Sequence, residues 1–158
     1  MSKQNTPFYA IKITNWHSEQ NKLQAIREQV FIKEQHVPIE LEWDEFDQSA
    51  THLLAQHKQK ETMLPIGTAR IVFNHKGKNN SAHIGRMAVL KAWRRMGVGS
   101  KLLQACIDEC KKHHSKKMIL NAQTSAIPFY QKAGFSINSE EFLDANIPHK
   151  EMILQLTD

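Results

Sequence analysis

A β-like segment that runs through a glycine turn into an amphipathic helix constrains this chain more than any other feature. The segment spans residues 82–90, the turn reads Arg94-x-x-Gly97-x-Gly99, and a helical apolar face continues to about residue 113. Glycines without a Cβ let the backbone approach a ligand, and the first turn of a helix leaves several N–H groups unpaired. The pattern therefore predicts a cradle for an anionic group such as a phosphate.

This turn differs from two common phosphate-binding patterns. In dinucleotide-binding folds the glycines of GxGxxG come directly after the strand, and a P-loop ends in Gly-Lys-Ser/Thr after four intervening residues. On its own, the pattern leaves open that Gly97 and Gly99 are only turn residues.

The rest of the chain alternates strand and helix signals around this passage. Apolar residues recur at helical spacing over residues 18–34, 98–113 and 126–132, and a Gly- and Asn-rich turn over 76–80 separates two β-like segments. No internal repeat or Pro/Ser-rich linker divides the chain, so we predict a single α/β domain over residues 1–158, with parallel βαβ character in its second half. The β-like segments are residues 8–13, 52–58, 66–74, 82–90, 117–122, 135–139 and 149–156.

Composition argues against several classes of protein. The chain has 158 residues, of which 41% are hydrophobic, and a formal net charge of +5. Its apolar runs are far shorter than the ~20 residues of a membrane helix, and its first residues lack the apolar core of a signal peptide. The basic residues show neither a stripe with interleaved aromatics nor a nucleic-acid reading helix. We therefore expect a soluble cytoplasmic protein with no membrane or nucleic-acid partner.

Two cysteines, Cys106 and Cys110, fall on one predicted helix. Their spacing is poorly suited to a disulfide, and the Cys or His partners of a zinc site are missing. We expect buried, reduced thiols and no metal site.

The motifs around the turn resemble those of the GCN5-related N-acetyltransferase (GNAT) superfamily in both order and spacing. The resemblance covers nearly the whole chain, because residues 26–38 and 141–149 are similar to the bacterial ElaA/YjcF-like branch of that superfamily. The motifs that carry it are Met87-Ala88-Val89, Arg94-x-x-Gly97-x-Gly99, Leu120-Asn121-Ala122-Gln123 and the segment from Pro128 to Phe135.

The resemblance implies a mixed sheet of about seven strands, flanked by about four helices and splayed between residues 82–90 and 117–122, with acetyl-CoA as acyl-donor cosubstrate in the gap. Strand backbone groups would bond the pantetheine, and the turn would hold the pyrophosphate. The net positive charge suits this anionic ligand. The implied cofactor-binding residues are Met87, Ala88, Val89, Arg94, Arg95, Met96, Gly97, Val98, Gly99, Ser100 and Asn121.

The activity that the resemblance implies is acetyl transfer to a primary amine of a small molecule or peptide, by direct attack in a ternary complex. Tyr130 matches the family position whose phenol lies near the sulfur, where an ordinary pKa of about 10 keeps it a proton donor. The backbone N–H near Val89 would polarise the acetyl carbonyl.

The proton acceptor for the amine is less clear from the sequence. Members of the superfamily often place a glutamate six residues before the position that matches Val89, and here that residue is His83. The acidic stretch 40–47 is predicted to be an acidic loop or a short helix. It is either solvated, as a loop, which we favour, or a wall that faces a cationic acceptor. The other candidate acceptors are His149, Glu40, Glu42, Asp44, Glu45 and Asp47.

Two alternatives to this function remain open. A noncatalytic acyl-CoA sensor would keep the glycine turn but would have no need of Tyr130. An acyl-homoserine-lactone-synthase-like acyltransferase is the other, because Arg27-x-x-x-Phe31 followed by Trp43, Glu45 and Asp47 resembles those synthases. The sequence names neither the acceptor nor the range of acyl groups, and it leaves a homodimer open.

Overall fold

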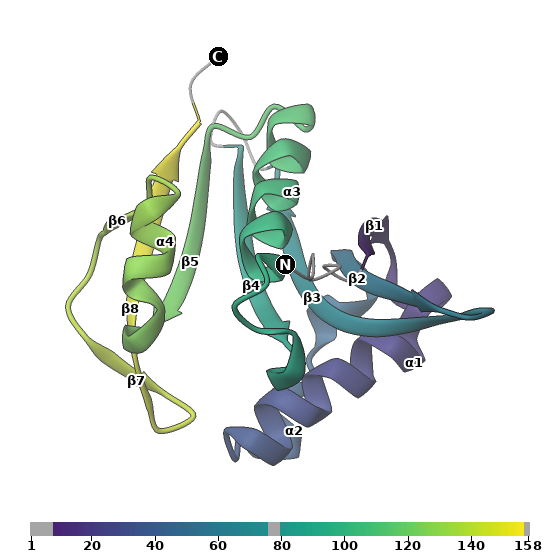
Figure 1. The fold of residues 1–158 in the computed structure, drawn as a ribbon. Coiled ribbons are helices and arrows are strands. Elements are labelled where there is room, and N and C mark those ends of the chain that lie inside the picture. Colours follow the sequence, from purple (N-terminus) through teal and green to yellow (C-terminus); the bar gives the residue numbers. More distant parts are fainter. Residues whose placement is uncertain (1–7, 76–79, 157–158) are drawn as a thin grey trace, which may run out of the picture.

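The computed structural model describes residues 8–75 and 80–156, and in this part of the chain an eight-stranded sheet carries the fold (Figure 1). The strand order is β1-β2-β3-β4-β5-β8-β6, and β7 pairs with β8. The strands are β1 (Tyr9–Thr14), β2 (Thr51–Gln59), β3 (Thr62–Asn74), β4 (Ser81–Val89), β5 (Lys117–Gln123), β6 (Ser136–Ile137), β7 (Phe142–Asp144) and β8 (Ile147–Gln155). The helices are α1 (Trp16–Arg27), α2 (Ile39–Glu42), α3 (Val98–Lys112) and α4 (Ile127–Lys132).

The predicted α/β class and mixed sheet are confirmed. Each predicted β-like segment contains a strand, whereas β7 is an additional strand that the sequence does not predict. Ala145 and Asn146 both have positive φ, which makes the tight turn that folds β7 back onto β8. Residues 76–79 of the predicted turn between β3 and β4 lie outside the described residues.

The sheet opens between β4 and β5. These two strands form the parallel pair of a β4-α3-β5 unit, in which Ser81–Ile84 pairs with Lys117–Leu120. The pairing ends at Ile84 and Leu120, and beyond that point the strands diverge, as Figure 1 shows. The predicted splay is therefore present where the resemblance places it.

Helix α3 covers one face of the opened sheet with a fully apolar side. Val98, Leu102 and Cys106 are at most 1% exposed, and the helix packs mainly on β3 and β4. Both cysteines are buried and free, as expected. Burial raises the pKa of Cys106 and raises that of Cys110 to about 12, so both stay thiols at neutral pH.

The predicted helix over 18–34 consists of two pieces. Asn15 caps α1 by accepting a hydrogen bond from the Ser18 amide at 2.9 Å, which starts the helix at Trp16. After Arg27 the chain continues as a π-helical segment, Glu28–Glu34, with wider turns. This segment brings Val30 and Phe31 against Ala88 of β4.

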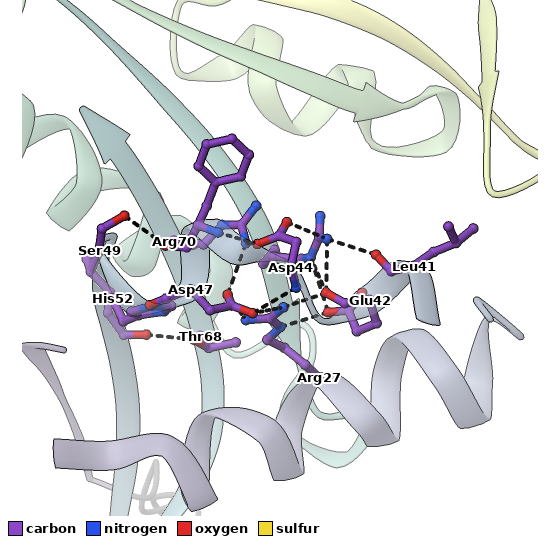
Figure 2. A network of polar contacts seen from close by, with 12 residues as sticks. Arg27, Leu41, Glu42, Asp44, Asp47, Ser49, His52, Thr68 and Arg70 are labelled. Carbon is purple, nitrogen blue, oxygen red and sulfur yellow. Dashed lines mark hydrogen bonds and ion pairs between the residues drawn. The ribbon is translucent and has the colours of Figure 1, made fainter. Parts of the chain in front are cut away.

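The acidic stretch 40–47 forms α2 and a 3-10 turn, Glu45–Gln48, rather than the solvated loop that we favour from the sequence. Glu40 and Glu45 are exposed, but Glu42 and Asp47 are only 3% and 2% exposed. Arg27, at 0% exposure, donates from Nε to Glu42 Oε1 at 2.7 Å and from Nη1 to Asp47 Oδ1 at 2.6 Å (Figure 2). The prediction is wrong for Glu42 and Asp47 because their partners lie on distant segments.

We call this cluster the Arg27 network, and it joins three arginines to three carboxylates. Arg70 of β3 donates from Nη1 to Asp44 and Asp47, while Arg86 of β4 contacts Glu42 and Asp44. Burial acts to raise the pKa of Asp47, but the hydrogen bonds and charges of the arginines outweigh it, and the pKa lies below its usual value. The members of the network are Arg27, Glu42, Asp44, Asp47, Arg70 and Arg86.

No helix among the described residues is long and apolar enough to cross a membrane. Within the same residues, no cluster of three His, Cys, Asp or Glu side chains could hold a metal ion.

Candidate functional site

A bulge in β4 lies at the point where the sheet opens. Thr68 of β3 pairs with Ala88, but Arg70 pairs with Gly85, so β4 has one residue more than β3 between these two pairs. Arg86 takes up the extra residue with a positive φ of 50°. The β5-facing edge of β4 after Ile84 has no strand partner in the described part of the chain, so its backbone groups are free to bond a ligand.

A cavity of about 480 Å³ fills the space between the diverging strands, and we call it the main cavity. Its walls come from β3, β4, β5, α4, the π-helical segment, α2 and the β7–β8 turn. The structure thus brings together most side chains that the sequence singles out in the strands and in α4. Those that line the cavity are His83, Met87, Ala88, Val89, Arg94, Asn121, Tyr130 and His149.

A second hollow of about 240 Å³, the turn pocket, lies at the start of α3. It shares Val89 and Arg94 with the main cavity, so the two hollows adjoin. No side chain caps the helix, which leaves the N–H groups of its first turn free for an anion. Of the predicted turn residues, Met96 is exposed and does not line the pocket; those that do are Arg94, Arg95, Gly97, Val98, Gly99 and Ser100.

The two glycines of the turn serve different needs. Gly97 has a φ of 80°, a left-handed conformation that side chains with a Cβ rarely adopt. At Gly99 the backbone is ordinary, but a Cβ would lie 3.5 Å from the Phe129 ring, inside the turn pocket. Gly97 therefore shapes the turn, and Gly99 keeps the pocket open.

Arg94 connects the turn to its surroundings. Its Nε donates to the Val89 carbonyl at 2.9 Å, and its two terminal nitrogens bind the Glu34 carboxylate at 2.7 and 2.8 Å. The hydrogen bond from Arg94 lowers the pKa of Glu34. Arg94 thus links β4 to the π-helical segment, and Glu34 matches its charge. An anion in the turn pocket would therefore depend on backbone N–H groups and Arg95.

Tyr130 of α4 lies at the opening between the strands. Its hydroxyl donates to Met87 Sδ at 3.8 Å, and its ring meets Phe129 and Phe135 edge-on. Burial raises the pKa of Tyr130 to about 12. The phenol therefore stays protonated at neutral pH and already donates to a sulfur atom.

Two histidines line the main cavity on the same face of the sheet. His83 on β4 is exposed, whereas His149 on β8 is 8% exposed and stacks on Phe142. His149 Nδ1 donates to the Ile147 carbonyl at 2.6 Å, so in the neutral ring Nε2 carries the lone pair. Both side chains can accept a proton in the cavity.

The carboxylates proposed as proton acceptors do not fit this role. Glu42 lines the main cavity, but Arg27 and Arg86 both bind its carboxylate. Asp44 and Asp47 are held in the Arg27 network. The structure does not bring Glu40 or Glu45 to either hollow among the residues it describes.

Sequence reasoning missed two groups of cavity residues. Arg86 lines the main cavity from the β4 bulge, which strand alternation alone does not reveal, and Arg70 lines it from the neighbouring strand β3. Gln35 and Gln123 also line it, and the Gln123 amide donates to Gln35 Oε1 at 2.8 Å, which links β5 to the end of the π-helical segment.

The family model described as Acetyltransferase (GNAT) domain matches residues 14–156. The chain belongs to the GNAT family. An uncharacterized N-acetyltransferase of Bacillus subtilis, YjcF, is 40% identical to this GNAT chain over 129 residues, which are 81% of this chain and 86% of YjcF. The ElaA/YjcF-like assignment is thus confirmed.

Solved structures agree with this assignment of the GNAT chain. Escherichia coli ElaA superposes with a TM-score of 0.79 at 25% identity, over 92% of this chain and 99% of ElaA. A CoA-dependent acyl-homoserine lactone synthase, BjaI, solved with SAM and isopentyl-CoA, gives a TM-score of 0.72 over 95% of this chain and 84% of its own. At 16% identity, that likeness shows a shared fold.

Proposed function

We propose that this GNAT protein transfers the acetyl group of acetyl-CoA to a primary amine by direct attack in a ternary complex. The observation that carries the proposal is the meeting of the turn pocket and the main cavity at Val89 and Arg94. The turn pocket, which suits an anion, thus adjoins the unpaired edge of β4 and the phenol of Tyr130. Acetyl-CoA, when bound, supplies an activated thioester.

The residues present fit such a ligand. The backbone of β4 from Gly85 to Val89 has no partner on its β5 side among the described residues, so it can bond a pantetheine chain as an added strand would. The turn pocket has uncapped helix N–H groups and no side chain at Gly99 to fill it, which suits a pyrophosphate. BjaI, which shares this fold, was solved with isopentyl-CoA, which supports a CoA ligand for this chain.

Tyr130 is the proposed proton donor to the departing thiolate. Its pKa of about 12 keeps the proton on the phenol, and its hydrogen bond to Met87 Sδ supports the hydroxyl as a donor to sulfur. The Val89 amide is the proposed donor to the acetyl carbonyl oxygen. Asn121, exposed and on the cavity side of β5, would orient the pantetheine or a water molecule.

His83 is the proposed proton acceptor for the amine, with His149 as its rival in the same cavity. If His83 takes the proton, His83→Gln should lower kcat/KM by at least about tenfold and flatten the fall in activity toward acidic pH, because that fall reports protonation of the base. The matched variant His149→Gln should keep the wild-type pH profile. Comparing kcat/KM of the three proteins from pH 6 to 9 tests the assignment, and a flattened profile in His149→Gln alone would transfer the role to His149.

Binding at the turn pocket gives a second test. Gly99→Val should lower CoA affinity by at least about tenfold, since its methyl groups enter the pocket beside Phe129 and displace a charge-assisted contact. Gln104→Val places the same residue on the exposed side of α3 and should bind CoA like the wild type. Calorimetric titration measures both, with thermal melts to compare folding. Wild-type affinity in Gly99→Val would remove the pyrophosphate from this pocket.

The experiment that tests the function is thiol release from acetyl-CoA over a panel of amines, polyamines, amino sugars, amino acids and peptides. We expect at least one class to accelerate release, and Gly99→Val to abolish that acceleration. Tight acetyl-CoA binding without acceleration by any amine would instead support the sensor. The synthase-like alternative gains no support from the site, because Asp47 is bound to two arginines and Glu45 is exposed.

A further inference from the structure

Arg70 lines the main cavity and has guanidinium nitrogens without a hydrogen-bond partner among the described residues. The residue lies on β3, is 7% exposed and lines the cavity. Its Nη1 donates to Asp44 Oδ1 at 2.7 Å and to Asp47 Oδ1 at 3.0 Å. Its Nε is buried without a hydrogen-bond partner, and no contact of Nη2 is found among the described residues. The two carboxylates thus occupy one end of the group and leave the Nε/Nη2 edge vacant.

A buried, unpaired N–H group is costly, so a vacant edge beside a cavity indicates a ligand that completes it. The Nε and Nη2 hydrogens of arginine point the same way, and this fork matches the two oxygens of a carboxylate. Arg86, the other arginine of this wall, has its donors directed to the carbonyls of Leu41 and Glu42 and to Asp44. The Nε/Nη2 edge of Arg86 is therefore occupied, whereas no hydrogen bond is found for that edge of Arg70 among the described residues.

The charges around Arg70 allow an anion to bind there. Of the carboxylates in the Arg27 network, Glu42 lines the main cavity, whereas Asp44 and Asp47 are absent from its walls as far as the described residues define them. Arg27 and Arg86 both bind the Glu42 carboxylate, so its charge is matched within the Arg27 network. The other acidic side chain of the cavity, Asp144, belongs to β7 across the opening.

The position of Arg70 relates this edge to the proposed acetyl site. Arg70 pairs with Gly85 of β4, three residues before Ala88. Because this stretch contains the bulge, it matches only the two-residue step from Thr68 to Arg70 on β3, which is roughly 7 Å at about 3.3 Å per residue. A single small molecule can therefore reach Arg70 with one end and the acetyl group with the other.

We propose that Arg70 binds the carboxylate of the acceptor through its Nε/Nη2 edge, so that the acceptor is an amino acid. This inference rests on the proposed function, because it names the substrate class of the same cavity. The amine of that molecule would point toward Val89 and Tyr130.

The test compares acceptors that differ only in the carboxylate. Linear amino acids, from glycine to longer ω-amino acids, are assayed beside their own carboxamides, and the longer pairs have nearly equal amine basicity. We expect kcat/KM for the acid to exceed that for the amide by on the order of 10- to 100-fold at one or more chain lengths, the size of a charge-assisted hydrogen bond. Equal use of acid and amide at every length would overturn the proposal.

Two variants separate ligand binding from damage to the network. Arg70→Lys keeps the charge beside Asp44 and Asp47 but loses the fork, and should bring the acid-to-amide ratio close to one. Arg27→Lys disturbs Glu42 and Asp47 as well, but Arg27 has no exposed surface and does not line the described cavity, so it should keep the wild-type ratio. An unchanged ratio in Arg70→Lys would contradict the assignment, and the wild-type comparison stands even where a variant fails to fold.

Calorimetric titration of the same pairs, with and without CoA, distinguishes the two proposals. Equal acetylation of acids and amides would leave the function standing and reject the carboxylate site. Tighter binding of acids than amides that depends on Arg70, without any acetylation, would keep the site and reject the function. An absence of both acetylation and binding would reject both.

Discussion

Tyr130→Phe is expected to slow acetyl transfer by roughly 10², the ordinary contribution of a general acid, while acetyl-CoA affinity stays nearly intact. Phenylalanine keeps the ring and its contacts with Phe129 and Phe135, so the only group lost is the hydroxyl in front of Met87 Sδ. A thiolate is a fairly good leaving group without protonation, so the variant should retain part of the transfer rate. The measurement is single-turnover transfer at saturating acetyl-CoA.

The control for this variant is Tyr9→Phe. The Tyr9 hydroxyl is also buried and has no hydrogen-bond partner within the described residues, so its removal should leave the rate unchanged. Because the pKa of Tyr130 is about 12, the wild-type rate should show no loss from its ionisation up to about pH 10. A wild-type rate in Tyr130→Phe would reduce this residue to a packing role.

Asp47→Asn should lower the free energy of unfolding at pH 7 by about 3–5 kcal/mol, because it breaks a buried ion pair and leaves Arg27 with too little negative charge. The pKa of Asp47 is lowered in the folded state, so its contribution is present above the unfolded pKa of about 3.9 and disappears as the pH falls through the folded value. Urea unfolding at pH 7 and below pH 4 should show the difference from wild type narrowing in acid.

Two other acids of the same segment are the matched controls. Glu45→Gln changes an exposed carboxylate and should alter stability by less than about 0.5 kcal/mol. The stability that Glu42 contributes depends on pH in the opposite way to that of Asp47. Burial raises the pKa of Glu42, so its contribution to the free energy of unfolding is lost as the pH rises. Glu42→Gln, which resembles the protonated acid, should therefore cost less than Asp47→Asn at pH 7. Equal losses in all three variants would contradict this account of the network.

Local patterns were sufficient to predict the strand, turn and helix over residues 82–113. The left-handed conformation at Gly97 and the apolar face of α3 depend on residues close in sequence, and both are found in the structure. The spacing of apolar residues does not predict where an α-helix changes into another type of helix. The apolar pattern of residues 18–34 continues through Arg27, although the helix there widens into its π-helical segment.

The local spacing of residues could not predict contacts between segments that lie far apart in the sequence. Arg27 meets residues 15 and 20 positions away, and Arg70 meets Asp44 from 26 positions away, so the acidic stretch could not be paired with its arginines. The bulge at Arg86 interrupts strand alternation and moves side chains that simple alternation assigns to other faces. The bulge is why the sequence did not reveal Arg86 in the cavity wall, whereas Arg70 was missed because its carboxylate partners lie far away in the sequence.

The most direct measurement of the central claim is a single turnover with isotopically labelled acetyl-CoA and the best amine of the panel, followed by mass spectrometry of small molecules and of the intact protein. The account predicts free CoA and labelled N-acetyl amine in equal amounts, with no label on the protein, because both cysteines are buried thiols and transfer is direct. Labelled protein, or bound acetyl-CoA that yields no N-acetyl amine, would contradict it.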